Sequence, residues 1–327
     1  MDWKTQYYVV GDNAYMICIL SAAKCLTAEE GQTTRFEQSA AFPADLIRLL
    51  YLDYENVETL VHHADRELRT LIEAKDPACI GRVREDMAKL RELHPFFKIT
   101  ELEWSDRLAA AEEKGLKGLT DILPRKRLSQ ITSELYMIQR QIKEIFHRVL
   151  DVDREKSTVL DRLEVYYSVH GDENLRTYSF RSLTTRYEKT PQSFAEVLYP
   201  ESVFDLVDFC LRLCIQREER MRVCKNCGRY FAVGKTMKSE YCNNFPDEKG
   251  RTCRDTGAIA AWTKKRENDD VYKNFRREYK KRFARIKAKT LLPDEFYSWS
   301  EQARQKKEQC DAGTITPEEF AAWLAKS

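Results

Sequence analysis

Apolar residues at helical spacing dominate most of the chain. Where such residues recur every three or four positions, one face of an amphipathic helix can pack against a core. This spacing predicts helices over residues 43–74, 81–93, 103–115 and 125–150, with Pro43 suited to a first helical turn. The last segment places its apolar residues along one stripe: Leu128, Ile131, Leu135, Ile138, Ile142, Ile145 and Phe146.

Shorter segments break this periodicity. Residues 7–26, "YYVVGDNAYMICILSAAKCL", are apolar on both sides of a Gly-Asp-Asn turn, which predicts a hairpin or a buried strand pair. Between residues 176 and 200, β-branched and aromatic residues bounded by turn residues predict a few more strands. Helical spacing resumes over residues 202–221.

The C-terminal residues predict a helix, a glycine turn and a second helix, with Thr316-Pro317-Glu318-Glu319 as a capping box. We therefore expect a mainly α fold in three parts. Residues 1–220 form a helical N-terminal region with a few short strands, residues 221–290 a small β-hairpin and helix module, and residues 291–327 a helical hairpin tail.

Composition narrows the class of protein. The 327 residues include only 11 glycines and 9 prolines, which argues against a turn-rich β-sandwich or barrel. No apolar run reaches the roughly 18 residues that a transmembrane helix needs. Asp2 also spoils the positively charged start of an export signal, so we expect a cytoplasmic protein with reduced thiols and no membrane partner.

Charge is unevenly distributed along the chain. The formal net charge is only +2, yet residues 221–290 hold 20 Lys and Arg against 8 Asp and Glu. Residues 1–220 and 291–327 are both net acidic. A basic module is therefore flanked by acidic segments, and a basic patch of this kind favours polyanionic partners.

Four of the ten cysteines lie in this basic module, spaced Cys224-x2-Cys227-x14-Cys242-x10-Cys253. Two thiolates separated by two residues can bind one ion, and four thiolates with no open position indicate a single structural Zn²⁺. Gly228 can take the positive φ that such a turn needs. Nearby cations would offset the thiolate charge of about −2; they are Arg222, Lys225, Arg229 and Lys235.

The same arrangement predicts local structure around the ion. Residues 228–241 would form a β-hairpin that returns the chain to the metal, and Asp255 or Thr256 would cap a helix after Cys253. Unrelated buried cysteines, or a redox role for Cys224 and Cys227, are the alternatives. No thioredoxin-like βαβ pattern surrounds that pair, which disfavours the redox interpretation.

The module resembles the CGNR-type zinc fingers, which look like treble clefs with a cysteine knuckle, a hairpin and a helix bearing the last ligand. Residues 195–327, through "CKNCGRYF", "TCRDTGA", "YKNFRREYKKRFARIK" and "TPEEFAAWL", also resemble an uncharacterised bacterial family with such a finger near its end. The finger resemblance implies a DNA-binding or regulatory role. The chain departs from it at Cys253-Arg254-Asp255-Thr256, which replaces Cys-Gly-Asn-Arg, and at the insertion "NNFPDEKGRT".

Residues 256–289 predict a basic helix with an aromatic stripe, broken or re-capped at Asn268-Asp269-Asp270. Cations on its remaining faces would neutralise phosphates, with DNA favoured over RNA. The candidate nucleic-acid contacts are Lys264, Lys265, Arg266, Lys273, Arg276, Arg277, Lys280, Lys281, Arg282 and Arg285. A solvated helix face, or docking onto an acidic protein surface, is the rival interpretation.

One candidate for catalysis remains. Arg140 and His147 are seven residues apart on the predicted helix 125–150, and therefore close to one face. This spacing resembles the Arg/His pair of the all-helical HEPN ribonucleases. That resemblance implies a histidine acting as acid or base and an arginine stabilising phosphate charge. The same spacing also arises readily in any charged helix, and no other residues indicate an enzyme.

Overall fold

The computed structural model divides into two compact units. Unit 1 contains residues 1–224 and 228–240, and unit 2 contains residues 225–227 and 241–327. The residues that the structure describes are 3–20, 35–153, 157–170, 177–234, 239–245, 247–267 and 269–326, without the side chains of residues 170 and 264–267.

Unit 1 contains an antiparallel five-stranded sheet in the order β3-β2-β1-β5-β4. The hairpin predicted within residues 7–26 is confirmed as β1 and β2, joined at Gly11 with φ +58°, while residues 21–26 lie outside the described part. The strands predicted between residues 176 and 200 are β4 and β5. The strands of the sheet are β1 (Trp3–Val10), β2 (Asn13–Leu20), β3 (Arg35–Ala41), β4 (Thr185–Lys189) and β5 (Phe194–Leu198).

Both faces of the sheet bury aromatic residues of β1. Side chains alternate across a strand, so Tyr7 and Tyr8 point to opposite faces, and they are 2% and 1% exposed. Tyr7 makes edge-on ring contacts with Phe96 and Phe209 at 5.9 and 6.1 Å. Tyr8 packs with Val197 of β5 in a second cluster. The central strand is therefore fixed from both sides.

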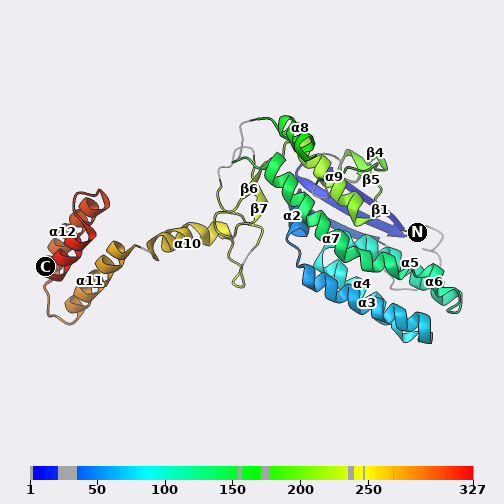
Figure 1. The fold of residues 1–327 in the computed structure, drawn as a ribbon, viewed down its shortest axis with the longest axis horizontal. Helices are drawn as coiled ribbons and strands as arrows, with labels where there is room; N and C mark the ends of the chain where they lie inside the picture. The colour runs from blue at the N-terminus through cyan, green and yellow to red at the C-terminus, as the bar shows by residue number, and fades with distance from the viewer. Residues whose placement is uncertain are drawn as a thin grey trace. The chain divides into compact units, whose positions relative to one another are not determined.

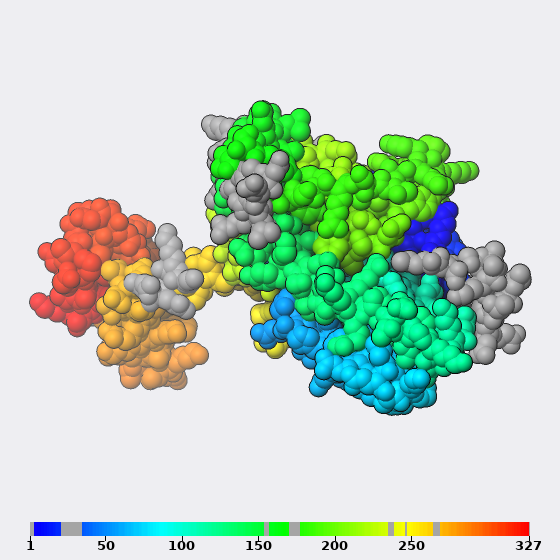
Figure 2. Space-filling view, turned by 45° about the vertical axis from the view of Figure 1, so that its right-hand side comes forward, coloured from blue at the N-terminus to red at the C-terminus, as the bar shows by residue number. Residues whose placement is uncertain are grey.

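The helices of unit 1 form a layer in which α3 packs on α4 and α7, and α4 packs on α5 (Figure 1). The space-filling view shows these cyan and green helices in unbroken contact (Figure 2). Most of the unit is helical, as predicted. The helices are α2 (Ala44–Leu50), α3 (Tyr54–Ala74), α4 (Ala78–Leu93), the 3₁₀ turn η1 (Pro95–Phe97), α5 (Lys98–Glu113), α6 (Leu119–Ile122), α7 (Arg125–Ile145), the π turn η2 (Phe146–Leu150), α8 (Val159–His170) and α9 (Val203–Gln216).

The predicted helix over residues 43–74 is in fact two helices. Asp53 adopts an extended conformation and caps α3 by accepting a hydrogen bond from the Glu55 N–H at 3.0 Å. An Asp side chain competes for backbone donors in this way and starts a new helix. Apolar periodicity continues across the break because α2 and α3 both pack on α7.

Unit 2 ends in three helices around a small core. The aromatic stripe predicted on the basic helix packs here: Phe275 and Tyr279 lie against Phe296, Trp299 and Phe320. Asp269 caps the second helix through the Tyr272 N–H at 2.8 Å, and the Thr316–Glu319 capping box is present. The helices of unit 2 are α10 (Cys253–Glu267), α11 (Asp270–Lys287), α12 (Pro293–Asp311) and α13 (Pro317–Lys326).

Within the part of the chain described, no helix combines the length and apolar character needed to cross a membrane.

Candidate metal centre and basic helix

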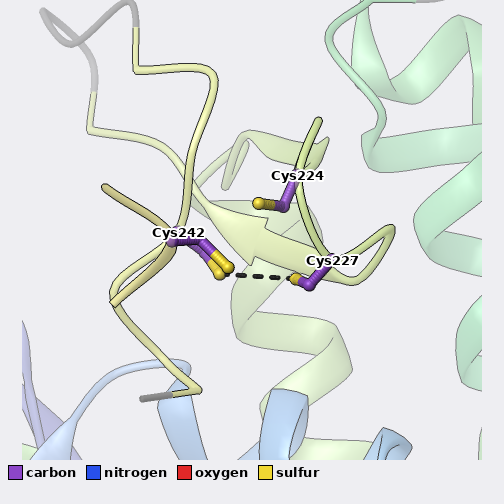
Figure 3. A group of neighbouring side chains, drawn as sticks. Cys224, Cys227 and Cys242 are labelled. Carbon is purple, nitrogen blue, oxygen red and sulfur yellow. Dashed lines mark hydrogen bonds between the residues drawn. The ribbon is translucent and has the colours of Figure 1, made fainter. Parts of the chain in front are cut away.

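Four cysteine side chains converge on one point. The sulfur atoms of Cys224, Cys227, Cys242 and Cys253 all lie within 4.8 Å of one another. Figure 3 shows the first three pointing toward one another, and the Cys227 and Cys242 sulfurs are 3.6 Å apart. A zinc tetrathiolate with bonds of about 2.3 Å has sulfur–sulfur edges of about 3.8 Å. The cluster therefore has the dimensions to hold a metal ion.

A tight turn presents the first two cysteines. The Cys224 N–H donates to the Arg229 carbonyl at 2.9 Å, and the Gly228 N–H donates to the Cys224 carbonyl at 2.9 Å. Gly228 has φ +70°, a conformation that a residue with a Cβ rarely adopts. The positive φ expected from the sequence is therefore present.

The hairpin at this turn differs from the predicted one. Strand β6 (Met221–Val223) pairs antiparallel with β7 (Tyr230–Ala232), so the cysteine turn is itself the hairpin loop. The prediction of a hairpin over residues 228–241 is therefore wrong in its position. Strand β7 pairs with β6, which precedes Cys224, and not with a strand after residue 232 in the described part of the chain. Residues 235–238 lie outside the described part.

The fourth cysteine lies at a helix start. Cys253 is the first residue of α10, and the helix is capped from Thr252, whose N–H and hydroxyl both donate to the Asp255 carboxylate at 2.8 and 2.7 Å. These bonds hold the pKa of Asp255 below its usual value. The predicted cap at Asp255 or Thr256 is thus wrong by a few residues. Because Cys253 is in the first turn, the helix carries its sulfur directly into the cluster.

The insertion between Cys242 and Cys253 closes on itself. The Asp247 carboxylate accepts two hydrogen bonds from the Arg251 guanidinium at 2.9 and 2.7 Å, and Gly250 turns with φ +73°. The Arg254 N–H donates to the Cys242 carbonyl at 3.0 Å. The long x10 spacing therefore adds a self-contained loop and leaves the two cysteines adjacent.

Two contacts beside the sulfurs were not predicted. The Asn226 side-chain amide lies 3.3 Å from the Cys253 sulfur, where an N–H can donate to a thiolate. Gly257 lies under the Tyr241 ring, and a Cβ there would fall 2.3 Å from a ring carbon. An isolated glycine in a helical stretch often marks close packing. The glycine of the "TGA" sequence, Gly257, could have indicated this contact.

A buried polar cluster fixes the base of the hairpin within unit 1. The Tyr230 hydroxyl donates to the buried Asp151 carboxylate at 3.3 Å and lies 3.0 Å from Nδ1 of His147. The Tyr230 N–H donates to the Tyr51 hydroxyl at 2.6 Å. These residues come from three separate segments of the chain, so periodicity gave no signal that they meet.

Two of the cations expected to offset the thiolate charge have other partners. Arg222 donates two hydrogen bonds to the Asp153 carboxylate at 2.8 and 2.9 Å. The Arg229 guanidinium lies 5.4 Å from the centre of the Tyr51 ring. Lys235 lies outside the described residues.

Arg140 and His147 have different surroundings. Arg140 is exposed, with its guanidinium 5.7 Å from the Tyr136 ring centre. His147 lies in the π turn η2 and is half-buried against Tyr230. The ribonuclease alternative stays a prediction.

The basic residues of α11 fall into two groups. Six of the predicted contacts are exposed: Lys273, Arg276, Arg277, Lys280, Lys281 and Arg285. Arg282 instead is 8% exposed, donates to Glu278 at 2.7 Å and to the Leu324 carbonyl at 3.3 Å, and stacks on Trp299. Its guanidinium is committed to the core of unit 2, so its assignment as a phosphate contact is corrected. The side chains of Lys264, Lys265 and Arg266 lie outside the described residues.

Fold and site together define a mainly helical protein with a four-cysteine cluster that could hold a metal ion. Residues 174–326 match a family described as "Family of unknown function (DUF6076)". The match covers β4 through α13, and so includes the cysteine cluster and the basic helix. Comparison with curated proteins and with solved structures gave no match.

Proposed function

We propose that this protein is a zinc-finger nucleic-acid-binding protein with a regulatory role, and that DNA is its partner. Cys224, Cys227, Cys242 and Cys253 bind one structural zinc ion, and the surface cations of α11 contact phosphates. The observation that carries the proposal is a row of surface cations on α11, in the same unit as three of the four clustered cysteines.

The donor set supports zinc. Soft thiolates favour zinc or iron over the hard cations Mg²⁺ and Ca²⁺, and four of them leave no open position for catalysis. The resemblance to CGNR-type fingers supports the proposal further, since the structure has a cysteine turn on a hairpin and a helix that carries the last sulfur in its first turn. The zinc supplies folding energy and no chemistry of its own.

Metal analysis tests this assignment. Purified full-length protein should contain one zinc per chain, and Cys224→Ser should lose it. Cys310→Ser is the matched control, because Cys310 lies in α12 outside the cluster. Zinc retained in full by Cys224→Ser, or iron in place of zinc, would contradict the assignment.

The cations of α11 are available for phosphate. Lys273, Arg276, Arg277 and Lys280 follow the spacing i, i+3, i+4 and i+7, which places them on one helix face. Among the described residues, Arg276, Arg277 and Lys280 form no ion pair. Each phosphate neutralised by such a side chain releases counterions and adds sequence-independent affinity.

Titration of a labelled DNA duplex at several salt concentrations tests the binding. Affinity should fall steeply with salt, and replacing four cations by Gln should weaken binding and reduce the salt slope by up to about four. The four replaced residues are Arg276, Arg277, Lys280 and Lys281. The control replaces four exposed cations of unit 1 with the same change in charge: Arg69, Lys114, Lys117 and Lys143.

Equal losses in the two variants would mean that only net charge matters, which contradicts a defined surface on α11. No binding to DNA or RNA at low salt would favour an acidic protein partner. RNA degradation that disappears in His147→Ala would favour the ribonuclease.

A further inference from the structure

An open groove of about 560 Å³ lies between α10 and α11 in unit 2. Trp262 and Thr263 contribute one side from α10. The other side comes from α11 and consists of Tyr272, Lys273, Arg276, Arg277 and Lys280. The groove thus combines an aromatic wall with the cation row described above.

Trp262 is the exposed tryptophan of the chain. Of the five tryptophans, all described, Trp104 and Trp299 are buried and Trp3 and Trp323 half-buried, whereas Trp262 is 50% exposed. Its ring meets Tyr272 edge-on, with centroids 5.7 Å apart and planes at 80°. An indole held this way against a second ring offers a large apolar surface to a ligand in the groove.

The cations lie within reach of the same ligand. Lys273 and Lys280 are separated by two helical turns, about 10 Å along the axis. Arg276 lies between them, with its guanidinium 6.0 Å from the Tyr272 ring centre. The groove therefore places positive charge from α11 beside the rings of Trp262 and Tyr272, which is the composition of grooves that bind single strands.

An aromatic wall distinguishes a single strand from a duplex. In a duplex each base face is covered by its neighbours, so a protein reaches phosphates and base edges only. An unpaired base can leave the stack and lie on an aromatic side chain. Trp262 would therefore contribute to the affinity for a single strand and not to the affinity for a duplex.

We propose that this groove binds single-stranded nucleic acid, with an unpaired base stacked on Trp262 and the adjoining phosphates on the cations of α11. This inference rests on the proposed function and specifies its ligand. Stacking does not depend on the 2′-hydroxyl, so DNA and RNA strands share the required chemistry.

The test measures binding of the full-length protein to oligo(dT), to oligo(U) and to a duplex of the same length. Trp262→Ala should weaken binding to both single strands by about 5- to 150-fold and change duplex binding less than about twofold. Trp262→Phe, which keeps a ring, should recover most of the loss. Ile259→Ala is the matched control, because Ile259 is 68% exposed on the same helix but outside the groove.

The outcomes separate this inference from the proposed function. If no nucleic acid binds wild-type protein at low salt, the proposed function fails. If duplex binding depends on the α11 cations while Trp262→Ala binds single strands like wild type, only the groove assignment fails. Equal losses on duplex and single strands would make Trp262 a support for the two helices and would also overturn the inference. Tryptophan fluorescence should be quenched by oligo(dT) in wild type and not in Trp262→Phe.

Discussion

At the scale of single residues, Tyr241 lies close to Gly257 and directly precedes the clustered Cys242. Gly257→Ala would place a Cβ 2.3 Å from the ring, so the ring or helix α10 must move. We expect lower thermal stability and faster loss of the proposed zinc ion to a chelator. In a Tyr241→Ala background the same substitution should cost much less, because the ring is gone.

Gly81→Ala provides the comparison for Gly257→Ala. Gly81 lies exposed in α4, and an alanine methyl group at this position would have no atom within 4 Å. Alanine there should stabilise by up to about 1 kcal/mol, since glycine is the poorer helix former. If Gly257→Ala stabilises to the same extent, the close packing against Tyr241 has no energetic consequence.

His94 should make stability depend on pH. It is fully buried, its Nε2 lies 2.9 Å from the Asp45 carbonyl, and its Nδ1 accepts from the Phe96 N–H at 3.2 Å. Burial lowers the pKa of His94 to about 3, against about 6.5 in an unfolded chain. The contribution of neutral His94 to the unfolding free energy is therefore complete above about pH 6.5. It is lost as pH falls toward about 3, because the unfolded chain takes up a proton that the folded chain does not.

Urea denaturation between about pH 7.5 and 4.5, a range that spans the unfolded pKa, measures this effect. His94→Asn keeps a hydrogen-bonding side chain but cannot titrate, so the difference in unfolding free energy between wild type and variant should narrow as pH falls. A constant difference across this range would rule out His94 as the source.

At this scale the sequence was informative about the sulfurs and less so about their neighbours. Cysteine spacing identified the four that meet, because metal ligation constrains local spacing. Arg282 was misassigned because its neighbours in sequence are solvated, while its partners Trp299 and Leu324 come from other helices. A charge pattern does not show which cation a core will use.

At the scale of elements, the hairpin β6–β7 depends on Tyr230. Its hydroxyl contacts both His147 and the buried Asp151 carboxylate, and its ring packs on Phe146 at 5.8 Å. Tyr230→Phe keeps the ring and removes the hydroxyl from both of these groups. We expect a loss of about 1–3 kcal/mol of unfolding free energy, measured by urea denaturation.

The control for that loss is Tyr187→Phe. Tyr187 is 70% exposed on β4, so its substitution should change stability by less than about 0.5 kcal/mol. Similar effects at the two positions would contradict a structural role for the Tyr230 hydroxyl.

Element types followed from periodicity, whereas element partners did not. Most helices and strands of unit 1 could be placed because period and turn residues are local properties, but β3, α6 and α8 were not predicted. The pairing of β1 with β5, Tyr7 opposite Leu198, joins segments about 190 residues apart, and no alternation pattern specifies it. The misplaced hairpin at residues 228–241 has the same cause, since β7 could pair on either side.

At the scale of the whole molecule, each unit has a core of its own. Leu68 is fully buried among the helices of unit 1, and Phe320 is fully buried among α11, α12 and α13. Apart from Arg282, the cations of α11 remain at the surface because the aromatic face of this helix packs in the second core. The cysteine cluster, the basic surface and this core thus occur together within the segment that matches the uncharacterised family.

Separate cores predict separate unfolding. Calorimetry of the full-length protein should show two transitions, as chains with more than one core commonly do. Phe320→Ala should lower the midpoint of one transition and Leu68→Ala the other, each costing about 2–5 kcal/mol. Phe320 packs against the face of α11 opposite the cations. At temperatures above the lowered midpoint of its own transition, Phe320→Ala should therefore also weaken nucleic-acid binding, whereas Leu68→Ala should not weaken it. A single transition lowered by both variants would show instead that the chain unfolds as one cooperative unit.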